Sequence, residues 1–259
     1  MPADAENAPD RPGRGGGSEG VQAWDLTDRP VAAIPSDLHL AHRRLAVGTL
    51  VEVAVAHQVG TGRLVDLVAG AGFDVRRAPT DDGRGPLVVA ASRARTLADS
   101  VAPDLRLLVC GVNPSLYSAD AGVGYARPGN RFWPAALAAG VATVDRDPVA
   151  ALAGGLGMTD FAKRATRTAA EVTRDEYLVG FARVTRLVEW LRPGAVCFVG
   201  LSGWRTVVDR HAVAGLQPSP IGGRPAYVMP STSGLNARTP LAELVDHLGA
   251  AWALVEATG

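Results

Sequence analysis

Lysine is nearly absent from this 259-residue chain, since Lys163 is the only one. Arginine supplies the rest of the positive charge. That bias is typical of a GC-rich genome, and it equally suits bidentate contact with phosphate groups. Basic and acidic residues number 26 each, so the formal net charge is zero. This balance argues against the uniformly basic surface of a strong non-specific nucleic-acid binder, although it leaves local contacts with DNA open.

Cysteine is also scarce. Only Cys110 and Cys197 are present, each within a short apolar run that predicts a buried strand. Two isolated cysteines cannot supply the four thiolates of an iron–sulfur cluster or of a structural zinc site, and no histidine stands at ligand spacing beside either. The five histidines are scattered along the chain. We therefore expect two buried free thiols, no metal and no other cofactor.

Long apolar runs are missing too. No run approaches the roughly 20 residues that a helix needs to span a bilayer, and the first residues lack the basic patch and apolar stretch of a secretory signal. Hydrophobic residues nevertheless make up 47% of the chain, which is ample for a packed core. We expect a cytoplasmic globular protein with no membrane partner.

The chain divides into a tail and two units. Residues 1–30 are rich in glycine, proline and charge, which predicts a disordered tail. Residues 31–100 predict a small α/β appendage, with helices at 36–46 and 61–72 and strands at 48–57, 73–79 and 86–94. Its GAGFDVR and LVVAASR segments resemble the C-terminal half of class I methyltransferases. The glycine-rich loop of that family does not precede Ser36, so we interpret the appendage as a non-catalytic remnant or packing module, with a working cofactor site as the alternative.

The third segment, residues 101–259, predicts an alternating α/β domain. Strands are expected at 105–112, 195–200 and 226–231, and helices at 130–140, 175–191, 204–210 and 240–255. This alternation implies a mostly parallel sheet with helices on both faces. In such sheets ligands bind at the carboxyl ends of the strands. The loops that follow strands are therefore the candidate functional sites.

Three of these segments carry unusual residues. The first strand runs directly into Asn113 and Pro114, although an Asn-Pro pair alone is an ordinary turn signal. Twelve residues later, the segment YARPGNRFW begins at Tyr125 and leads into an expected helix. The loop PSTSGLNAR, residues 230–238, follows the last strand. Two strand ends thus bring unusual loops to one edge of the sheet.

These segments resemble a known enzyme family. GVNPSLYSADAGVGYARPGNRFWPAALAAG and MPSTSGLNAR are similar to the two signature motifs of the mismatch-specific uracil and thymine DNA glycosylases, and GMTDFAKRAT and GLQP also resemble family segments. The likeness covers residues 104–250. It implies a uracil-DNA-glycosylase-like three-layer α/β/α fold and a monomer that removes uracil or thymine from G·U and G·T mismatches in double-stranded DNA, by hydrolysis and without a covalent intermediate.

The resemblance also implies roles for the residues around the first strand. An enzyme that acts on a base must extrude the nucleotide from the duplex and hold the base in a pocket. Asn113 would orient the attacking water, because its amide oxygen accepts a hydrogen bond but is no base at neutral pH. Tyr125 would stack on the base, with a core tyrosine as the alternative. The remaining base-pocket residues would be Val112, Pro114, Ser115 and Asn130, of which Asn130 is equally well explained as a helix cap.

The loop at residues 230–238 would contact the DNA. Leu235 is the expected wedge, which fills the space that the base leaves. Gly234 would permit close approach of the backbone, while Ser231, Ser233 and Arg238 would contact phosphates. An ordinary surface loop is the alternative interpretation for each of these residues.

The sequence departs from the family at two of these positions. Ser115 replaces the usual glycine after Asn-Pro, and Ser231-Thr232 stands where many bacterial members carry Asn-Pro, so the preferred base stays open. A DNA-lesion-binding module whose catalysis has decayed is therefore the second hypothesis, and an unrelated nucleotide-binding α/β protein is the third. A carboxylate near the sugar would stabilise a cation, so carboxylate catalysis is the alternative for Asp120 and Asp160, which we interpret as residues that cap or solvate loops.

Overall fold

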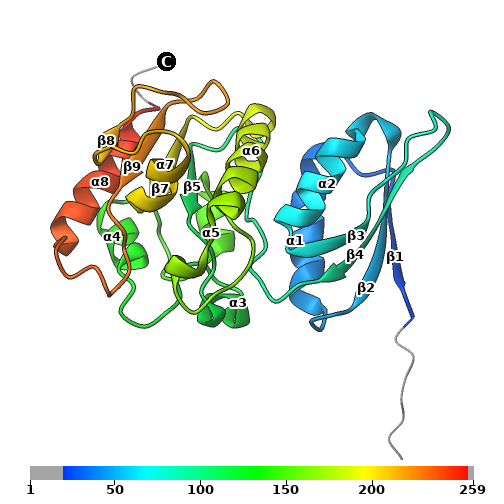
Figure 1. Ribbon diagram of the computed structural model, residues 1–259, viewed down its shortest axis with the longest axis horizontal. Helices are drawn as coiled ribbons and strands as arrows, with labels where there is room; N and C mark the ends of the chain where they lie inside the picture. The colour runs from blue at the N-terminus through cyan, green and yellow to red at the C-terminus, as the bar shows by residue number, and fades with distance from the viewer. Residues whose placement is uncertain (1–19, 256–259) are drawn as a thin grey trace, which may run out of the picture.

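Two β-sheets organise residues 20–255, the part of the chain that the computed structural model describes (Figure 1). The larger sheet has the strand order β6-β5-β7-β9-β8, and all of its neighbouring strands are parallel except β8 and β9. Its strands are β5 (Leu107–Gly111), β6 (Leu156–Asp160), β7 (Ala195–Val199), β8 (Gly215–Leu216) and β9 (Ala226–Met229). The carboxyl ends of β5, β6, β7 and β9 therefore meet at one edge of this sheet.

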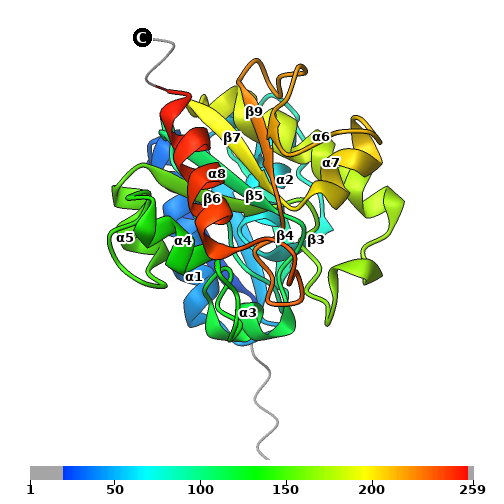
Figure 2. The same cartoon turned by 90° about the vertical axis from the view of Figure 1, so that its left-hand side faces the viewer.

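Helices cover both faces of the larger sheet, as Figure 2 shows with α4, α5 and α8 on one side and α6 and α7 on the other. Alternate residues of β5 supply the two cores, because Leu107 and Val109 point to one face while Leu108 and Cys110 point to the other. The helices are α3 (Leu116–Ala121), α4 (Phe132–Ala138), α5 (Pro148–Ala153), α6 (Arg174–Leu191), α7 (Leu201–Val207) and α8 (Leu241–Ala253). The predicted three-layer α/β/α fold is confirmed.

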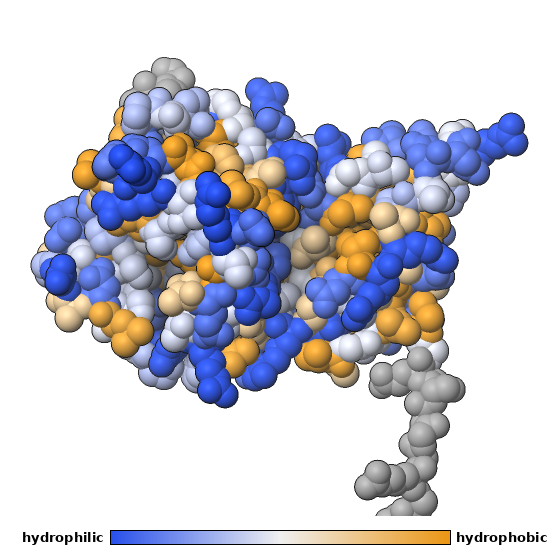
Figure 3. Space-filling model, viewed as in Figure 1, coloured by the Kyte–Doolittle hydropathy of each residue, from blue (hydrophilic) through white to orange (hydrophobic). Residues whose placement is uncertain are grey.

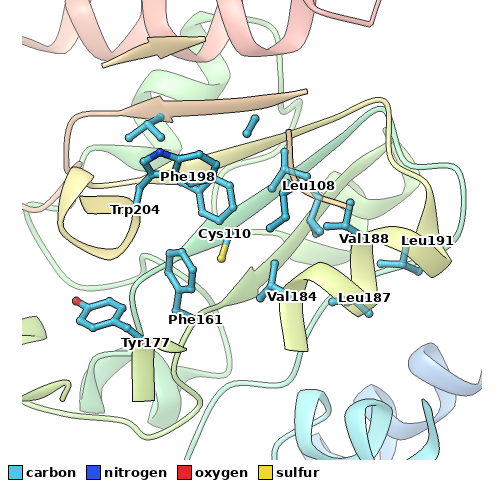
Figure 4. Close-up of a cluster of buried hydrophobic side chains, with 14 of the residues drawn as sticks. Leu108, Cys110, Phe161, Tyr177, Val184, Leu187, Val188, Leu191, Phe198 and Trp204 are labelled. Atoms are coloured by element: carbon cyan, nitrogen blue, oxygen red, sulfur yellow. The ribbon is translucent and has the colours of Figure 1, made fainter. Parts of the chain in front are cut away.

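The core beneath α6 holds most of the large apolar side chains of this unit. Val184, Leu187 and Leu191 project from α6 toward the sheet, while Phe161, Phe198 and Trp204 pack together beside them (Figure 4). A capping box at the start of α6, formed by Thr173 and Glu176, satisfies the first free backbone N–H groups of the helix. This rigid layer supports the sheet edge at which the strands end.

The smaller sheet has the order β1-β2-β4-β3 and forms a separate unit with its own apolar core. Its elements are β1 (Gln22–Leu26), α1 (Ile34–Arg44), β2 (Leu50–Val55), α2 (Thr61–Gly70), β3 (Phe73–Arg77) and β4 (Leu87–Arg93), with short 3-10 turns at Val31–Ala33 and His57–Val59. A further 3-10 turn, Ala169–Glu171, lies in the larger unit. Figure 1 shows α1 and α2 on the side that faces the larger unit.

Strand β1 corrects the prediction of a disordered segment at residues 1–30. It pairs in parallel with β2, and Trp24 and Leu26 pack against the core of the smaller unit. The hydrophobic pattern of this strand is a weak sequence signal, because only these two of its five side chains face the core. The rest of that prediction, residues 1–19, lies outside the described residues.

Several further elements differ from the expectations, and α3, α5 and β8 were not predicted. The segment LGMTD forms β6 although it was not predicted as a strand, because Gly157 interrupts its apolar pattern. That glycine is required, since a Cβ at this position would lie 2.3 Å from a methyl carbon of Leu105. The expected helix at 204–210 begins earlier, at Leu201, and the expected helix at 130–140 is the shorter α4. Among residues 20–255, no helix is both long and apolar enough to cross a bilayer.

The two units meet through α2 and α6. Arg186 of α6 forms an ion pair with Asp66 of α2 at 2.7 Å, and the guanidinium of Arg63 lies 5.4 Å from the centre of the Trp190 ring. Asp99 lies in the segment that joins the units. Its backbone N–H donates to the carbonyl oxygen of Gly70, and its carboxylate forms an ion pair with Arg183 of α6. These contacts fix the connecting segment next to the larger sheet.

Candidate active site

A cleft of about 510 Å³ lies at the edge where β5 and β6 end. Its walls come from the loop after β5, the segment that leads into α4 and the loop after β9. It brings together all but two of the residues predicted for the site: Val112, Asn113, Pro114, Ser115, Tyr125, Asn130, Ser231, Ser233 and Leu235. The other two, Gly234 and Arg238, lie outside it. Residues far apart in the sequence thus form one concave surface.

The side chain of Asn113 has a fixed orientation in this cleft. Its Nδ2 donates to the carbonyl oxygen of Arg164 at 2.9 Å and to Oγ1 of Thr166 at 2.7 Å. The Thr166 hydroxyl donates its own hydrogen to the carbonyl oxygen of Thr168, so it must accept from Asn113. Because carbonyl oxygens only accept, these contacts set which end of the amide is nitrogen. Oδ1 of Asn113 receives no hydrogen bond from the described residues and is available to a ligand.

Ser115 and the backbone around it shape the floor of the cleft. The Ser115 side chain caps α3 by accepting from the backbone N–H of Ser118 at 3.1 Å. The segment beyond Pro114 is tied to Thr166 by two backbone hydrogen bonds. Within residues 20–255, the backbone N–H groups of Asn113, Ser115 and Tyr125 donate to no other backbone group, so they are available to an oxyanion.

Tyr125 borders the cleft in a strained backbone conformation. Its φ of 58° lies in the left-handed region, which a tyrosine rarely adopts. One face of its ring stacks on Phe132, with the ring centres 4.2 Å apart. Its hydroxyl is buried and has no hydrogen-bond partner among the described residues. The tyrosine therefore belongs both to the edge of the core and to the wall of the cleft.

Asp160 is the cleft residue that our sequence interpretation placed wrongly. It does not cap a loop, because it ends β6 and lines the cleft beside Gly111, its partner in the parallel pair. A Cβ on Gly111 would lie 2.3 Å from the Asp160 carboxylate and 3.0 Å from the Tyr125 hydroxyl. Only glycine leaves room for both groups. Burial raises the pKa of Asp160 to about 6, and its carboxylate oxygens receive no hydrogen bond from the described residues.

The segment after Tyr125 is tied to the loop that follows β9. Asn130 accepts from the backbone N–H of Phe132 at 2.9 Å, but it is not the predicted N-cap, because that position of α4 is held by Arg131; the side chain of Asn130 also reaches the cleft. Arg131 donates its guanidinium hydrogens to the carbonyl oxygens of Asn236 and Thr239. This role of Arg131 could not be predicted from sequence, since its acceptors lie more than 100 residues away.

Leu235 stands at the tip of that loop, with 80% of its surface exposed. Ser231 and Ser233 hold the loop by accepting from the backbone N–H groups of Ser233 and Leu235, both at 3.3 Å. Gly234 permits a close approach, since a Cβ there would lie 2.9 Å from the carbonyl oxygen of Gly129. The group that comes close to Gly234 therefore belongs to another loop of this chain. Arg238 is exposed and lies outside the cleft.

A buried charge cluster lies behind the cleft. Asp99 forms ion pairs with Lys163 at 2.8 Å and Arg183 at 2.7 Å, and Arg183 also donates to the backbone carbonyl of Asp160. The amine of the single lysine is therefore engaged by a carboxylate and is not free for nucleophilic attack. Asp120, in contrast, pairs with Arg95 on the surface.

A comparison with known protein families matches this arrangement. The model of the uracil DNA glycosylase superfamily matches residues 98–255, which include every residue of the larger sheet and every loop of the cleft except for Leu97. This span is more than half of the chain, and it begins in the segment that joins the two units. The chain belongs to the uracil DNA glycosylase superfamily and is a DNA glycosylase of base-excision repair.

Proposed function

We propose that this glycosylase removes uracil, and thymine opposite guanine, from mismatched pairs in double-stranded DNA. The observation that carries the proposal is the fixed amide of Asn113, whose Nδ2 is held by Arg164 and Thr166 while Oδ1 is left for a ligand. An amide oxygen in this position accepts a hydrogen bond from water and aims the water at C1′ of the sugar. The lone pair of that water forms the new C1′–O bond as the glycosidic bond breaks, and the proton that the water releases is taken up by the departing base.

The departing base takes the bonding electrons, so the site must stabilise negative charge on a pyrimidine. The backbone N–H groups of Asn113 and Ser115 are suitable donors to its carbonyl oxygens. Asp160 contributes in its protonated form, because a neutral carboxyl donates a hydrogen bond while a carboxylate repels the leaving base. Its pKa of about 6 makes the neutral form accessible near neutral pH.

The base itself is recognised by shape and stacking. One face of the Tyr125 ring is covered by Phe132, so the other face is the surface on which a flipped base stacks. Val112, Pro114 and Asn130 complete the walls of the pocket. A cleft of about 510 Å³ is ample for one nucleotide, so its size alone does not select uracil over thymine.

The loop after β9 holds the duplex open in this proposal. Leu235 enters the stack at the vacated position, because an exposed apolar side chain at a loop tip is suited to insertion between bases. Arg131 holds this loop in place through its hydrogen bond to the carbonyl oxygen of Asn236. Ser231, Ser233 and Arg238 provide contacts to the flanking phosphates.

An excision panel tests this proposal. Duplexes of equal sequence that contain uracil, thymine, hypoxanthine or ethenocytosine opposite guanine are incubated with the protein and then cleaved with alkali at abasic sites. Single-stranded versions serve as the comparison. We expect product from uracil and, more slowly, from thymine in duplexes. Tight mismatch binding without abasic product from any base would instead favour the lesion-binding module.

A further inference from the structure

A second, smaller pocket of about 180 Å³ lies between the two units. It is lined by the C-terminal half of α1, the end of β4 and the end of α3. Leu97 and Ala98, from the connecting segment, line both this pocket and the active-site cleft. The two cavities are therefore neighbours, and Figure 3 shows hydrophilic residues along the lower part of the junction between the units.

The charged side chains of this pocket are mostly cationic. Arg43, Arg93, His39 and His42 line it together with one acid, Asp120. Asp120 is already held by Arg95 through two hydrogen bonds at 2.6 and 2.7 Å, so its charge is largely compensated. Within residues 20–255, no acid forms an ion pair with Arg43 or Arg93. Arg93 is partly buried, whereas Arg43 is exposed. A partly buried arginine without a carboxylate partner is costly unless an anion occupies the site.

An unused hydrogen-bond donor indicates the same ligand. Nε of Arg93 is buried without a partner among the described residues. Burial lowers the pKa of His39, and its Nδ1 donates to the carbonyl oxygen of Asp99 at 2.9 Å, so Nε2 of the neutral ring is an acceptor and offers no hydrogen to an anion. Burial, followed by the charge of Arg93, lowers the pKa of His42 to about 4. At neutral pH the positive charge of the pocket therefore comes from the two arginines.

We propose that this pocket binds a phosphate group, held by Arg43 and Arg93, and that a backbone phosphate of the DNA substrate is its favoured source. An arginine guanidinium matches phosphate oxygens in geometry as well as charge. Because the pocket adjoins the cleft, the smaller unit extends the DNA-binding surface beyond the loops of the glycosylase unit. This assignment goes beyond the proposed function and does not depend on which base is removed.

The salt dependence of DNA binding tests the DNA source. Dissociation constants for a fully matched duplex are measured over a range of salt concentrations for wild type, Arg43→Gln and Arg93→Gln. Each lost phosphate contact lowers the slope of log K against log salt by about 0.9. The matched control is Arg84→Gln, which removes the same charge from the hairpin between β3 and β4, away from the pocket. We expect the slope to fall by about 1 in the first two variants and to stay unchanged in the control.

Inorganic phosphate tests the free-anion source. Thermal unfolding is compared in phosphate and in chloride at equal ionic strength for the same four proteins. A rise in Tm with phosphate that is lost in Arg43→Gln and Arg93→Gln, together with unchanged DNA slopes, would assign the pocket to a free phosphate. No change in either measurement would overturn the proposal. Neither readout requires base removal, so failure of the proposed function and failure of this inference are distinguishable.

Discussion

Nδ2 of Asn113 lies 2.7 Å from Oγ1 of Thr166, across 53 residues of sequence. The Thr166 hydroxyl is committed as a donor to Thr168, so the contact fixes the Asn113 amide in one of its two orientations. Thr166 is therefore a positioning residue, since it acts through Asn113 on the water.

Thr166→Val keeps the shape of the side chain and removes the hydroxyl. We expect the single-turnover rate of uracil excision to fall about 10- to 100-fold, because the amide loses its fixed orientation. The dissociation constant for the mismatched duplex should stay within about 2-fold. Thr206→Val on α7 is the matched control, since its hydroxyl bonds only within its own helix. Equal excision rates for Thr166→Val and Thr206→Val would contradict the positioning role of Thr166.

Asp160 predicts a specific pH dependence of catalysis. The carboxyl is protonated below its pKa of about 6 and ionised above it, and only the protonated form can donate to the leaving base. We expect the excision rate of wild type to decline as pH rises through about 6. In Asp160→Asn, whose amide donates at every pH, that decline should disappear. A pH profile shared by wild type and Asp160→Asn would contradict the assigned role.

The same raised pKa predicts an effect on stability. The folded protein binds the Asp160 proton more tightly than the unfolded chain does, so stability is full at low pH and is lost as pH rises through about 6. Asp160→Asn should therefore raise the free energy of unfolding at pH 8, by on the order of 1 to 3 kcal/mol, and have little effect at pH 4. Denaturant unfolding at the two pH values measures the difference.

Leu235 predicts a difference between duplex and single-stranded substrates. Leu235→Ala removes the side chain that would fill the space in the stack, so excision from a G·U duplex should slow by about 10-fold, or about 1.4 kcal/mol. Excision from a single strand should be unchanged, because no stack has to be held open. Leu216→Ala, at another exposed leucine in β8, is the control. Equal slowing on both substrates would argue for a role in the pocket instead.

The sequence predicted strands β5, β7 and β9 of the larger sheet and most of the cleft because their signals are local. Asn113 directly follows the apolar run of β5, and Tyr125 and Leu235 stand in loops beside well-marked elements. Asp160 escaped prediction because β6 contains a glycine and few apolar side chains. Thr166 and Arg131 also escaped, since their partners are brought to them only by the folded chain. Strand β1 was missed because its pairing with β2 supplies most of its stabilisation.

The position of the charge cluster behind the cleft could not be predicted either. Asp99, Lys163 and Arg183 come from three different segments of the chain, and nothing in their spacing indicates that they meet. The smaller pocket could not be predicted for the same reason, because Arg43 and Arg93 belong to separate elements of the smaller unit. Contacts of this kind depend on the packing of whole elements.

The central claim is that Asn113 positions the water that attacks the sugar. Its most direct test is the single-turnover rate of uracil excision from a G·U duplex by wild type and by Asn113→Ala, measured beside the dissociation constant for the same duplex. We expect a rate at least about 100-fold lower in the variant, with binding changed by no more than about 2-fold. Equal excision rates for the two proteins, or binding by both without any abasic product, would contradict it.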